Sequence, residues 1–252
     1  MTSNNPEQET FLLIHGAWVS GAAWDEIAEH LRADGHDVHA PTMRGCGPEA
    51  TGEAMLIDAV DSVVEYITDR DLTEVTLVGY SFGGIVVQQV AARVADRIKR
   101  CVFHSALVLR TGESAYDVLP SKIVDFYKAQ IADGLIGLPF ATMRELFAAE
   151  LDYPAAVAVY DNHVYPHSES MFAAQVDTSA FDEMAAEGLP LSWVHASDDA
   201  ALGFGWRSWG RFADRLSGLG ITRVVHLPGA GHMAPLTASE ATAQAYIAAS
   251  RD

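Results

Sequence analysis

Short apolar runs alternate along this 252-residue chain with longer stretches whose apolar residues recur every three or four positions. A continuous apolar run of about four to eight residues is typical of a strand that is buried on both faces, and the wider spacing is typical of a helix with one buried face. Repeated alternation of the two predicts parallel strands joined by crossing helices. We therefore expect an α/β fold, with a mostly parallel sheet of about six strands and helices on both of its faces.

The expected elements follow directly from these runs. Strands are predicted at residues 11–14, 37–40, 75–78, 101–103, 191–194 and 224–227. Helices are predicted at residues 22–33, 53–69, 82–95, 206–216 and 238–249.

The alternation stops between about residues 107 and 188, a stretch rich in aromatic residues with short helical patterns at 123–132 and 142–150. Ligand sites in open α/β sheets lie at the carboxyl ends of the strands, and an insertion between two strands is expected to fold over those ends. We predict one domain with a first core part at residues 1–106, an inserted helical cap at 107–188 and a second core part at 189–252.

A glycine-rich turn follows the third predicted strand. Its sequence, Gly79-Tyr80-Ser81-Phe82-Gly83-Gly84, contains the pattern G-x-S-x-G between a buried strand and a helix. In that setting a sharp turn exposes a nucleophilic serine at the top of the sheet, beside the positive end of the helix. The alternative is an ordinary turn in which the serine only caps the helix. We predict Ser81 as a catalytic nucleophile.

A serine hydroxyl needs a neighbouring base, and a third group must orient that base. His232 lies between the last predicted strand and the last helix, on the same side of the sheet as Ser81, and is the predicted base. The acid is expected after the preceding strand, where Asp198 and Asp199 are adjacent. The pattern alone does not separate these two carboxylates.

Backbone N–H groups that bind a developing oxyanion are expected in two loops. Phe82, directly after the predicted nucleophile, supplies one of them. Ala17 supplies the other, in the segment His15-Gly16-Ala17-Trp18 that follows the first predicted strand. The oxyanion hole is therefore predicted at Ala17 and Phe82.

These segments resemble a known family. Residues 11–47, with His15–Trp18 and Gly35-His36-Asp37-Val38, together with residues 79–84, 194–209 and 229–235, are similar to α/β-hydrolases of the plant methylesterase and hydroxynitrile lyase type and to related bacterial esterases. The resemblance implies the α/β-hydrolase fold. It also favours Asp199 as the acid, because the family's acid tends to precede a tryptophan by ten residues and Trp209 stands there. Relatives usually have a proline about four residues after the acid, whereas this chain has Gly203.

The lyases of this group use a lysine directly after the histidine and a threonine near the oxyanion loop. Met233 and Gly16 stand at those positions here. The resemblance therefore implies ester hydrolysis. We expect a carboxylic ester or lactone of a medium-sized, mainly apolar small molecule to be cleaved through an acyl-enzyme on Ser81. A lyase, C–C cleaving or cyclising enzyme with the same triad is the alternative, followed by a non-catalytic ligand-binding protein.

Substrate-binding side chains are predicted from the aromatic-rich cap and from the loops at the sheet top. An apolar pocket is expected there, although several of these side chains must also form core beneath the cap. The predicted set is Trp18, Tyr127, Phe140, Phe147, Tyr160, His163 and Met233.

No metal or other cofactor is expected. His163 and His167 are four residues apart, but Pro166 between them disfavours a shared helical face. Cys46 and Cys101 have no zinc-binding spacing and are too few for a disulfide framework.

The 34 acidic residues outnumber the 16 basic ones, giving a formal net charge of −18 at pH 7. We expect no nucleic-acid partner, because phosphate backbones are bound by clustered Lys and Arg. The polar, acidic start and the lack of an apolar run of about 20 residues predict neither a signal peptide nor a membrane segment. We expect a cytoplasmic protein, monomeric or homodimeric.

Overall fold

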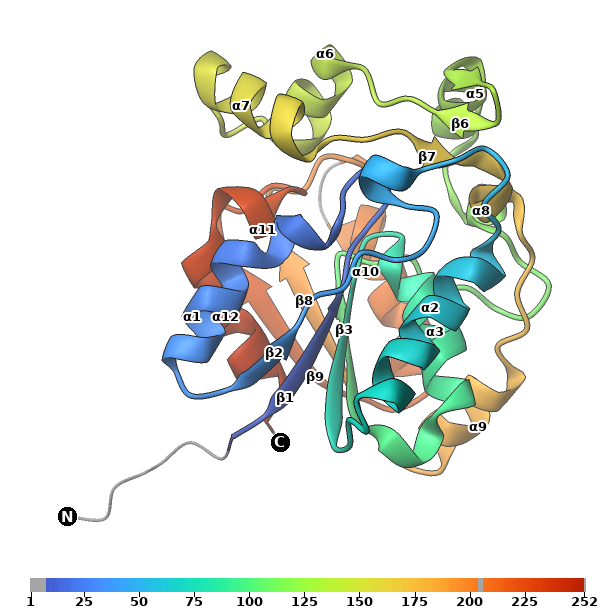
Figure 1. Cartoon of the computed structure of the whole chain (residues 1–252), viewed down its shortest axis with the longest axis vertical. Helices are drawn as coiled ribbons and strands as arrows, with labels where there is room; N and C mark the ends of the chain where they lie inside the picture. The colour runs from blue at the N-terminus through green and yellow to red at the C-terminus, as the bar shows by residue number, and fades with distance from the viewer. Residues whose placement is uncertain (1–7, 204–205, 252) are drawn as a thin grey trace.

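Six parallel strands form the central sheet, in the order β2-β1-β3-β4-β8-β9 (Figure 1). The structure is a computed structural model and describes residues 8–203 and 206–251. The strands are β1 (Thr10–Ile14), β2 (Asp37–His39), β3 (Val75–Tyr80), β4 (Ile98–His104), β8 (Leu191–Ala196) and β9 (Ile221–Leu227). A second, antiparallel sheet consists of β5 (Ile131–Ala132), β6 (Leu135–Ile136) and β7 (His167–Ser168).

The main helices lie between strands of the central sheet, except for the last helix, which follows β9. They are α1 (Asp25–Ala33), α2 (Leu56–Asp69), α3 (Gly83–Arg93), α9 (Ser179–Ala186), α10 (Trp206–Ser217) and α12 (Ser239–Ala249). The other helical elements are η1 (Gly21–Trp24), η2 (Gly47–Glu49), η3 (Ala95–Arg97), α4 (Ala115–Val118), α5 (Ser121–Ala129), α6 (Phe140–Thr142), the π-helical η4 (Met143–Phe147), α7 (Tyr153–His163), α8 (Glu169–Ala173) and α11 (Ala234–Thr237).

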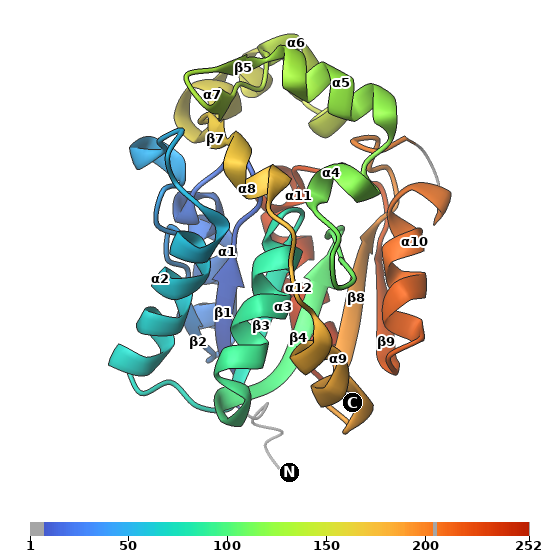
Figure 2. The same ribbon diagram turned by 90° about the vertical axis from the view of Figure 1, so that its right-hand side faces the viewer.

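Helices cover the sheet on both faces. Helices α1 and α12 pack together on one face, whereas α2, α3 and α9 lie on the other (Figure 2). Helix α10 packs against β8 and β9 near one edge of the sheet. The predicted α/β fold, with a parallel sheet of about six strands and helices on both faces, is confirmed.

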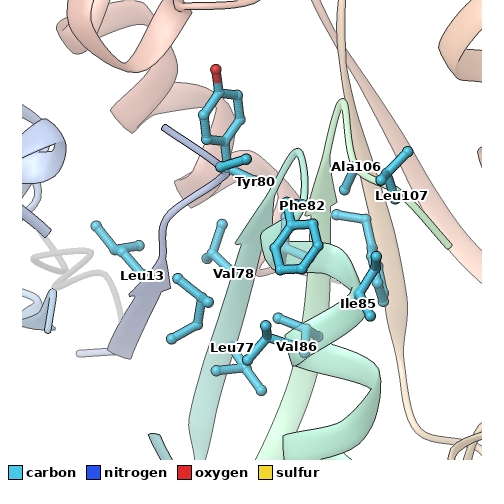
Figure 3. Packing of buried hydrophobic residues seen from close by; sticks show 14 of the residues in the cluster. Leu13, Leu77, Val78, Tyr80, Phe82, Ile85, Val86, Ala106 and Leu107 are labelled. Atoms are coloured by element: carbon cyan, nitrogen blue, oxygen red, sulfur yellow. The ribbon is translucent and has the colours of Figure 1, made fainter. Parts of the chain in front are cut away.

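The core follows from the apolar runs of the strands. All six residues of β3 are buried, as are all six of β8, because helices cover both faces of these strands. Figure 3 shows Leu77 of β3 beside Val86 of α3, and it also labels Val78 of β3 and Ile85 of α3. These four side chains are at most 1% exposed. The strand–turn–helix unit that carries Ser81 is therefore held in the middle of the core.

The chain reverses direction across the sheet between β1 and β3. The strand β1 has β2 on one side and β3 on the other, so the connections after β1 and after β3 leave in opposite directions. Such a switch point leaves a crevice at the carboxyl ends of the two strands. The loop after β1 contains Ala17, and the turn after β3 contains Ser81. The topology thus brings these two segments together.

Between β4 and β8 the chain builds most of the structure above the carboxyl ends of the strands. Helices α5, α6 and α7 lie over these ends in both views (Figures 1 and 2). The small sheet β5-β6-β7 and the π-helical segment were not expected from the sequence. Helix α9, which belongs to the same stretch, packs against α3 beside the central sheet. The cap boundaries 107–188 stay a prediction.

Among the described residues, no helix combines the length and apolar character that crossing a membrane requires.

Candidate active site

Ser81 occupies a strained turn between β3 and α3. Its φ of 54° lies in the left-handed region, which non-glycine residues rarely adopt. Glycines on both sides permit the tight turn: a Cβ at Gly79 would lie 2.8 Å from the Gly83 carbonyl oxygen, and one at Gly83 would lie 2.6 Å from the Ile14 carbonyl oxygen. Both contacts are too short for a real side chain. The turn therefore requires the glycines that the G-x-S-x-G pattern supplies.

The structure brings the three predicted triad residues into one line of hydrogen bonds. His232 Nδ1–H donates to Asp199 Oδ2 at 2.6 Å, and the Ser81 hydroxyl donates to His232 Nε2 at 3.0 Å. Asp199 and His232 are almost completely buried, with side chains 1% and 3% exposed. The bond to the carboxylate fixes the imidazole tautomer that leaves Nε2 free to accept the serine proton.

The Asp199 carboxyl is held in its ionised form. Burial disfavours the charge, but the positive charge that His232 can carry and the hydrogen bonds from His232 and from the Ala201 N–H outweigh it, so the pKa of Asp199 falls below its usual value. Asp198 is exposed and accepts a hydrogen bond from the Ser197 hydroxyl at 2.7 Å. Of the two adjacent carboxylates, the structure places only Asp199 against His232.

Aromatic rings enclose the His232 imidazole. Trp209 stacks on it with an interplanar angle of 14° and a centroid distance of 5.0 Å. Phe147 meets it edge-on at 5.1 Å. Tyr80 lies at 5.1 Å, and its hydroxyl donates to the His232 carbonyl oxygen at 2.8 Å. These contacts leave the imidazole little freedom to rotate away from Ser81.

Two backbone N–H groups near Ser81 indicate a candidate anion site. Within the described residues, neither the Ala17 N–H nor the Phe82 N–H has an acceptor. Phe82 immediately precedes the first turn of α3, where the helix dipole also favours negative charge. Gly16 permits the approach of the two loops, since a Cβ there would lie 2.9 Å from the Cβ of Ser81. Ala17 and Phe82 therefore have the free donors that an oxyanion hole needs.

Trp18 connects this loop to the segment above the sheet. Its φ is 62°, a second left-handed non-glycine residue at the site. The indole Nε1–H donates to the Ile136 carbonyl oxygen at 2.9 Å, and the Tyr165 N–H donates to the Trp18 carbonyl oxygen at 2.8 Å. The side chain is 4% exposed. The position of the oxyanion loop thus depends on contacts with β6 and with the chain after α7.

A small cavity opens beside the Ser81 hydroxyl. Its free volume is about 20 Å³, room for about one water molecule. Apart from Ser81 and His232, its walls are apolar or aromatic. The lining residues are Ala17, Trp18, Ser81, Phe82, Leu107, Leu119, Tyr127, Phe147, Phe172, Ala201, Leu202, Trp209 and His232.

Three of the predicted substrate-binding residues, Trp18, Tyr127 and Phe147, line this cavity. The other four lie elsewhere. Phe140 and Tyr160 pack against each other edge-on at 5.4 Å, and the Tyr160 hydroxyl donates to the Leu138 carbonyl oxygen.

His163 lines a separate hollow together with Asp25 and Glu26. Met233 is buried beside the site, and its N–H donates to the Phe147 carbonyl oxygen at 2.9 Å. Neither residue is part of the cavity wall.

Several wall residues were not predicted as part of the site. Leu107 follows the end of β4, and Ala201 and Leu202 follow the acid, so the rule that sites lie at strand ends could have indicated them. The sequence indicated Trp209 only as a marker that favours Asp199 over Asp198, and not as a wall residue. Phe172, from α8, is one of the cap aromatics from which an apolar pocket was predicted, but nothing in the local sequence distinguishes it from core aromatics.

In the described part of the chain, no group of three or more His, Cys, Asp and Glu side chains could hold a metal ion. His167 is buried against Trp18, Phe82 and Phe172, and burial lowers its pKa to about 3. Cys101 is a free, buried thiol, as expected from the apolar run that contains it.

Comparison with known proteins gives relatives of the kind that the sequence resembles. A carbendazim hydrolyzing esterase of Nocardioides sp. (strain SG-4G) is 36% identical over 127 residues, which are 49% of this chain and 52% of that protein. An alpha-hydroxynitrile lyase of Arabidopsis thaliana is 25% identical over 251 residues, which cover 90% of this chain and 91% of the lyase. This chain thus matches about half the length of the esterase and nearly all of the lyase.

Several solved structures are similar along nearly the whole chain, and one of them also has a higher sequence identity. It is an extracellular alpha/beta-hydrolase from a Paenibacillus species, described as sharing structural and functional homology with tobacco salicylic acid binding protein 2. It is 31% identical, has a TM-score of 0.90 and covers 97% of this chain and 100% of its own. The model of the alpha/beta hydrolase family matches residues 11–245. The chain therefore belongs to the alpha/beta hydrolase family.

Proposed function

We propose that the protein is a serine hydrolase that cleaves a carboxylic ester or lactone of a mainly apolar small molecule. The observation that carries the proposal is the unbroken line of hydrogen bonds from Asp199 through His232 to Ser81, next to two free backbone N–H groups. A nucleophile, its base, the group that orients the base and an anion site are the parts that acyl transfer requires.

In the first step, His232 Nε2 takes the Ser81 proton while Oγ attacks the ester carbonyl carbon. The carbonyl oxygen becomes an oxyanion and accepts hydrogen bonds from the Ala17 and Phe82 N–H groups. When the tetrahedral intermediate collapses, the C–O bond to the alcohol breaks and the imidazolium gives its proton to the departing oxygen. The acyl group stays on Ser81 as an ester.

In the second step, water takes the place of the alcohol. His232 removes a proton from the water, which attacks the acyl carbon, and the same two N–H groups stabilise the second oxyanion. Collapse releases the carboxylic acid and returns the proton to Ser81. The ionised Asp199 stabilises the imidazolium in both steps.

The surroundings of the triad support a small, apolar substrate. The cavity beside Ser81 is walled by aliphatic and aromatic side chains, and apolar walls with few polar groups are typical of small-molecule sites. Relatives with partial matches include a carbendazim hydrolyzing esterase and a pyrethroid hydrolase. Their names specify substrates of those two proteins only, but both names describe hydrolases, which supports a hydrolytic reaction for this chain.

A second candidate is a non-hydrolytic reaction such as lyase chemistry, which the nearly full-length match to an alpha-hydroxynitrile lyase favours. Two features of this chain argue against it. Met233, which brings no charge, follows the histidine where the resemblance described above implies a lysine in lyases of this group. At Gly16, where they have a threonine, a Cβ would lie 2.9 Å from that of Ser81. Incorporation of labelled oxygen from water into the acid product would identify hydrolysis.

The proposal is tested by turnover of p-nitrophenyl acetate by the wild type and by Ser81→Ala, with the folding of both checked by circular dichroism. We expect the variant to lose at least about 10³-fold in kcat, because the covalent route is removed. Equal turnover by the two proteins would overturn the assignment of Ser81. Activity in neither, with this ester and a panel of methyl esters and lactones, would overturn ester hydrolysis.

A further inference from the structure

A second hollow adjoins the cavity at Ser81. Its free volume is about 240 Å³, compared with about 20 Å³ for the inner cavity. Tyr127, Phe147 and Ala201 line both spaces. The complete lining of this outer hollow is Lys122, Ile123, Phe126, Tyr127, Thr142, Leu146, Phe147 and Ala201.

The inner cavity alone is too small for an apolar ester. Its free volume holds about one water molecule, so most of an acyl group with several carbons must lie outside it. Substituents beyond the reacting carbonyl therefore need further space. The outer hollow shares the wall residues Tyr127, Phe147 and Ala201 with the inner cavity, so it is the adjoining space in which such substituents could be bound.

The outer hollow has the character of a binding surface. Phe126 and Leu146 are 36% and 41% exposed and line the hollow together, so both contribute apolar surface to it. Most of the remaining lining is aliphatic or aromatic, with a single charged side chain, Lys122. The two sides of the hollow come from α5 and from the π-helical segment with its flanks, which directly follows α6. Helices α5 and α6 lie above the sheet (Figure 2).

We propose that the outer hollow is a specificity subsite that binds an uncharged apolar substituent of the ester while its carbonyl is held at Ser81. This inference rests on the proposed function. Each methylene group that leaves water against these walls contributes up to about a fourfold gain in kcat/KM. Selectivity for chain length is thus set at Phe126 and Leu146, outside the triad.

The test measures kcat/KM for two series of esters. One series extends the acyl group from p-nitrophenyl acetate to the butyrate, hexanoate and octanoate, and the other extends the alcohol from methyl acetate to butyl, hexyl and octyl acetate. Wild type is compared with Phe126→Ser, Leu146→Ser and Ser81→Ala. The matched control is Ile131→Ser, since Ile131 is an equally exposed apolar residue (37%) above the sheet that lines neither space.

We expect kcat/KM of the wild type to rise at least about tenfold along one of the two series, and that series identifies which side of the ester occupies the hollow. Phe126→Ser and Leu146→Ser are expected to reduce the long-to-short ratio about threefold or more, whereas Ile131→Ser preserves it. Two results would overturn the subsite and leave the proposed function standing, provided that acetate hydrolysis depends on Ser81. One is a wild-type kcat/KM that does not change with chain length in either series. The other is a long-to-short ratio of kcat/KM that is the same in Phe126→Ser and Leu146→Ser as in the wild type. Acetate hydrolysis that does not depend on Ser81 would overturn both.

Discussion

Replacing Asp199 by Asn tests how the triad depends on one buried charge. The carboxylate is 1% exposed, accepts the Nδ1–H of His232 at 2.6 Å and also accepts the Ala201 N–H at 3.0 Å. Asparagine has nearly the same shape, so the fold is expected to survive. It carries no charge, and its amide can donate to Nδ1, which would place the imidazole proton on Nε2 and block acceptance from Ser81.

The magnitude follows from the burial of the pair. Removing one partner of a buried ion pair costs about 3–5 kcal/mol, and here the imidazolium is formed during the reaction, so the loss falls on the transition state. At about 1.36 kcal/mol per factor of ten, this equals a reduction of about 10²–10⁴ in kcat. The wrong tautomer adds to the loss, so we expect a value near the upper end.

The assay compares kcat for p-nitrophenyl acetate in the wild type, Asp199→Asn and the matched control Asp198→Asn. Asp198 is adjacent, exposed and bonded to the Ser197 hydroxyl, so its variant is expected to retain activity within about twofold. Thermal unfolding of each protein checks that it is folded. Loss of activity in Asp198→Asn, or a loss below tenfold in a folded Asp199→Asn, would refute the reasoning.

Two further predictions concern buried rings. Burial lowers the pKa of His15 to about 4 and the pKa values of His104 and His167 to about 3, so the folded state holds these rings neutral. Their contribution to stability is complete above about pH 6.5 and is lost as the pH falls towards 4, by about 1.4 kcal/mol per ring and pH unit. The free energy of unfolding, measured with urea between pH 7 and pH 4.5, should fall with this dependence on pH. In His167→Leu the free energy should fall less steeply, and an equally steep fall would contradict the prediction. Replacing Trp209 by Leu should lower kcat about 5–30-fold, because the parallel indole ring orients His232 and stabilises the imidazolium. Trp209→Phe, which keeps an aromatic ring, should retain most of the wild-type kcat. Equal kcat values in the two variants would argue against a role of the stacked ring.

Much of the fold could be predicted because strands buried on both faces are continuously apolar. The predicted strands are shorter than the observed ones where polar residues enter the sheet. β4 begins at Ile98, before the predicted start, because Arg100 is buried there with its guanidinium bonded to the Ser192 hydroxyl. β9 likewise begins at Ile221, ahead of Arg223, whose guanidinium donates to the Ala248 carbonyl oxygen. Such pairings depend on a distant strand or helix and leave no local pattern.

The segment above the sheet could be predicted less well. Its strands have two residues each, too few for an alternating pattern. Aromatic composition also does not tell which face a ring occupies: Phe147 lines the cavity, whereas Phe140, seven residues earlier, packs against Tyr153 and Tyr160. The placement of such rings depends on tertiary packing.

The triad positions could be predicted because chain order and strand ends restrict them. Ser81, Asp199 and His232 each follow a strand of the same parallel sheet, so the sequence alone places them at one edge. The choice between Asp198 and Asp199 needed the geometry, because adjacent residues point in different directions. Family resemblance favoured Asp199, and the hydrogen bond to His232 gives the physical reason.

The central claim is that Ser81 carries an acyl group during turnover. Mass spectrometry of the intact protein, mixed rapidly with excess p-nitrophenyl acetate and quenched in acid, measures this directly, with peptide mapping to locate the modification. The account predicts a mass increase of one acetyl group on the peptide that contains Ser81, and no increase in Ser81→Ala. An acetyl group on another residue, or turnover with no acyl-enzyme under single-turnover conditions that slow deacylation, would contradict it.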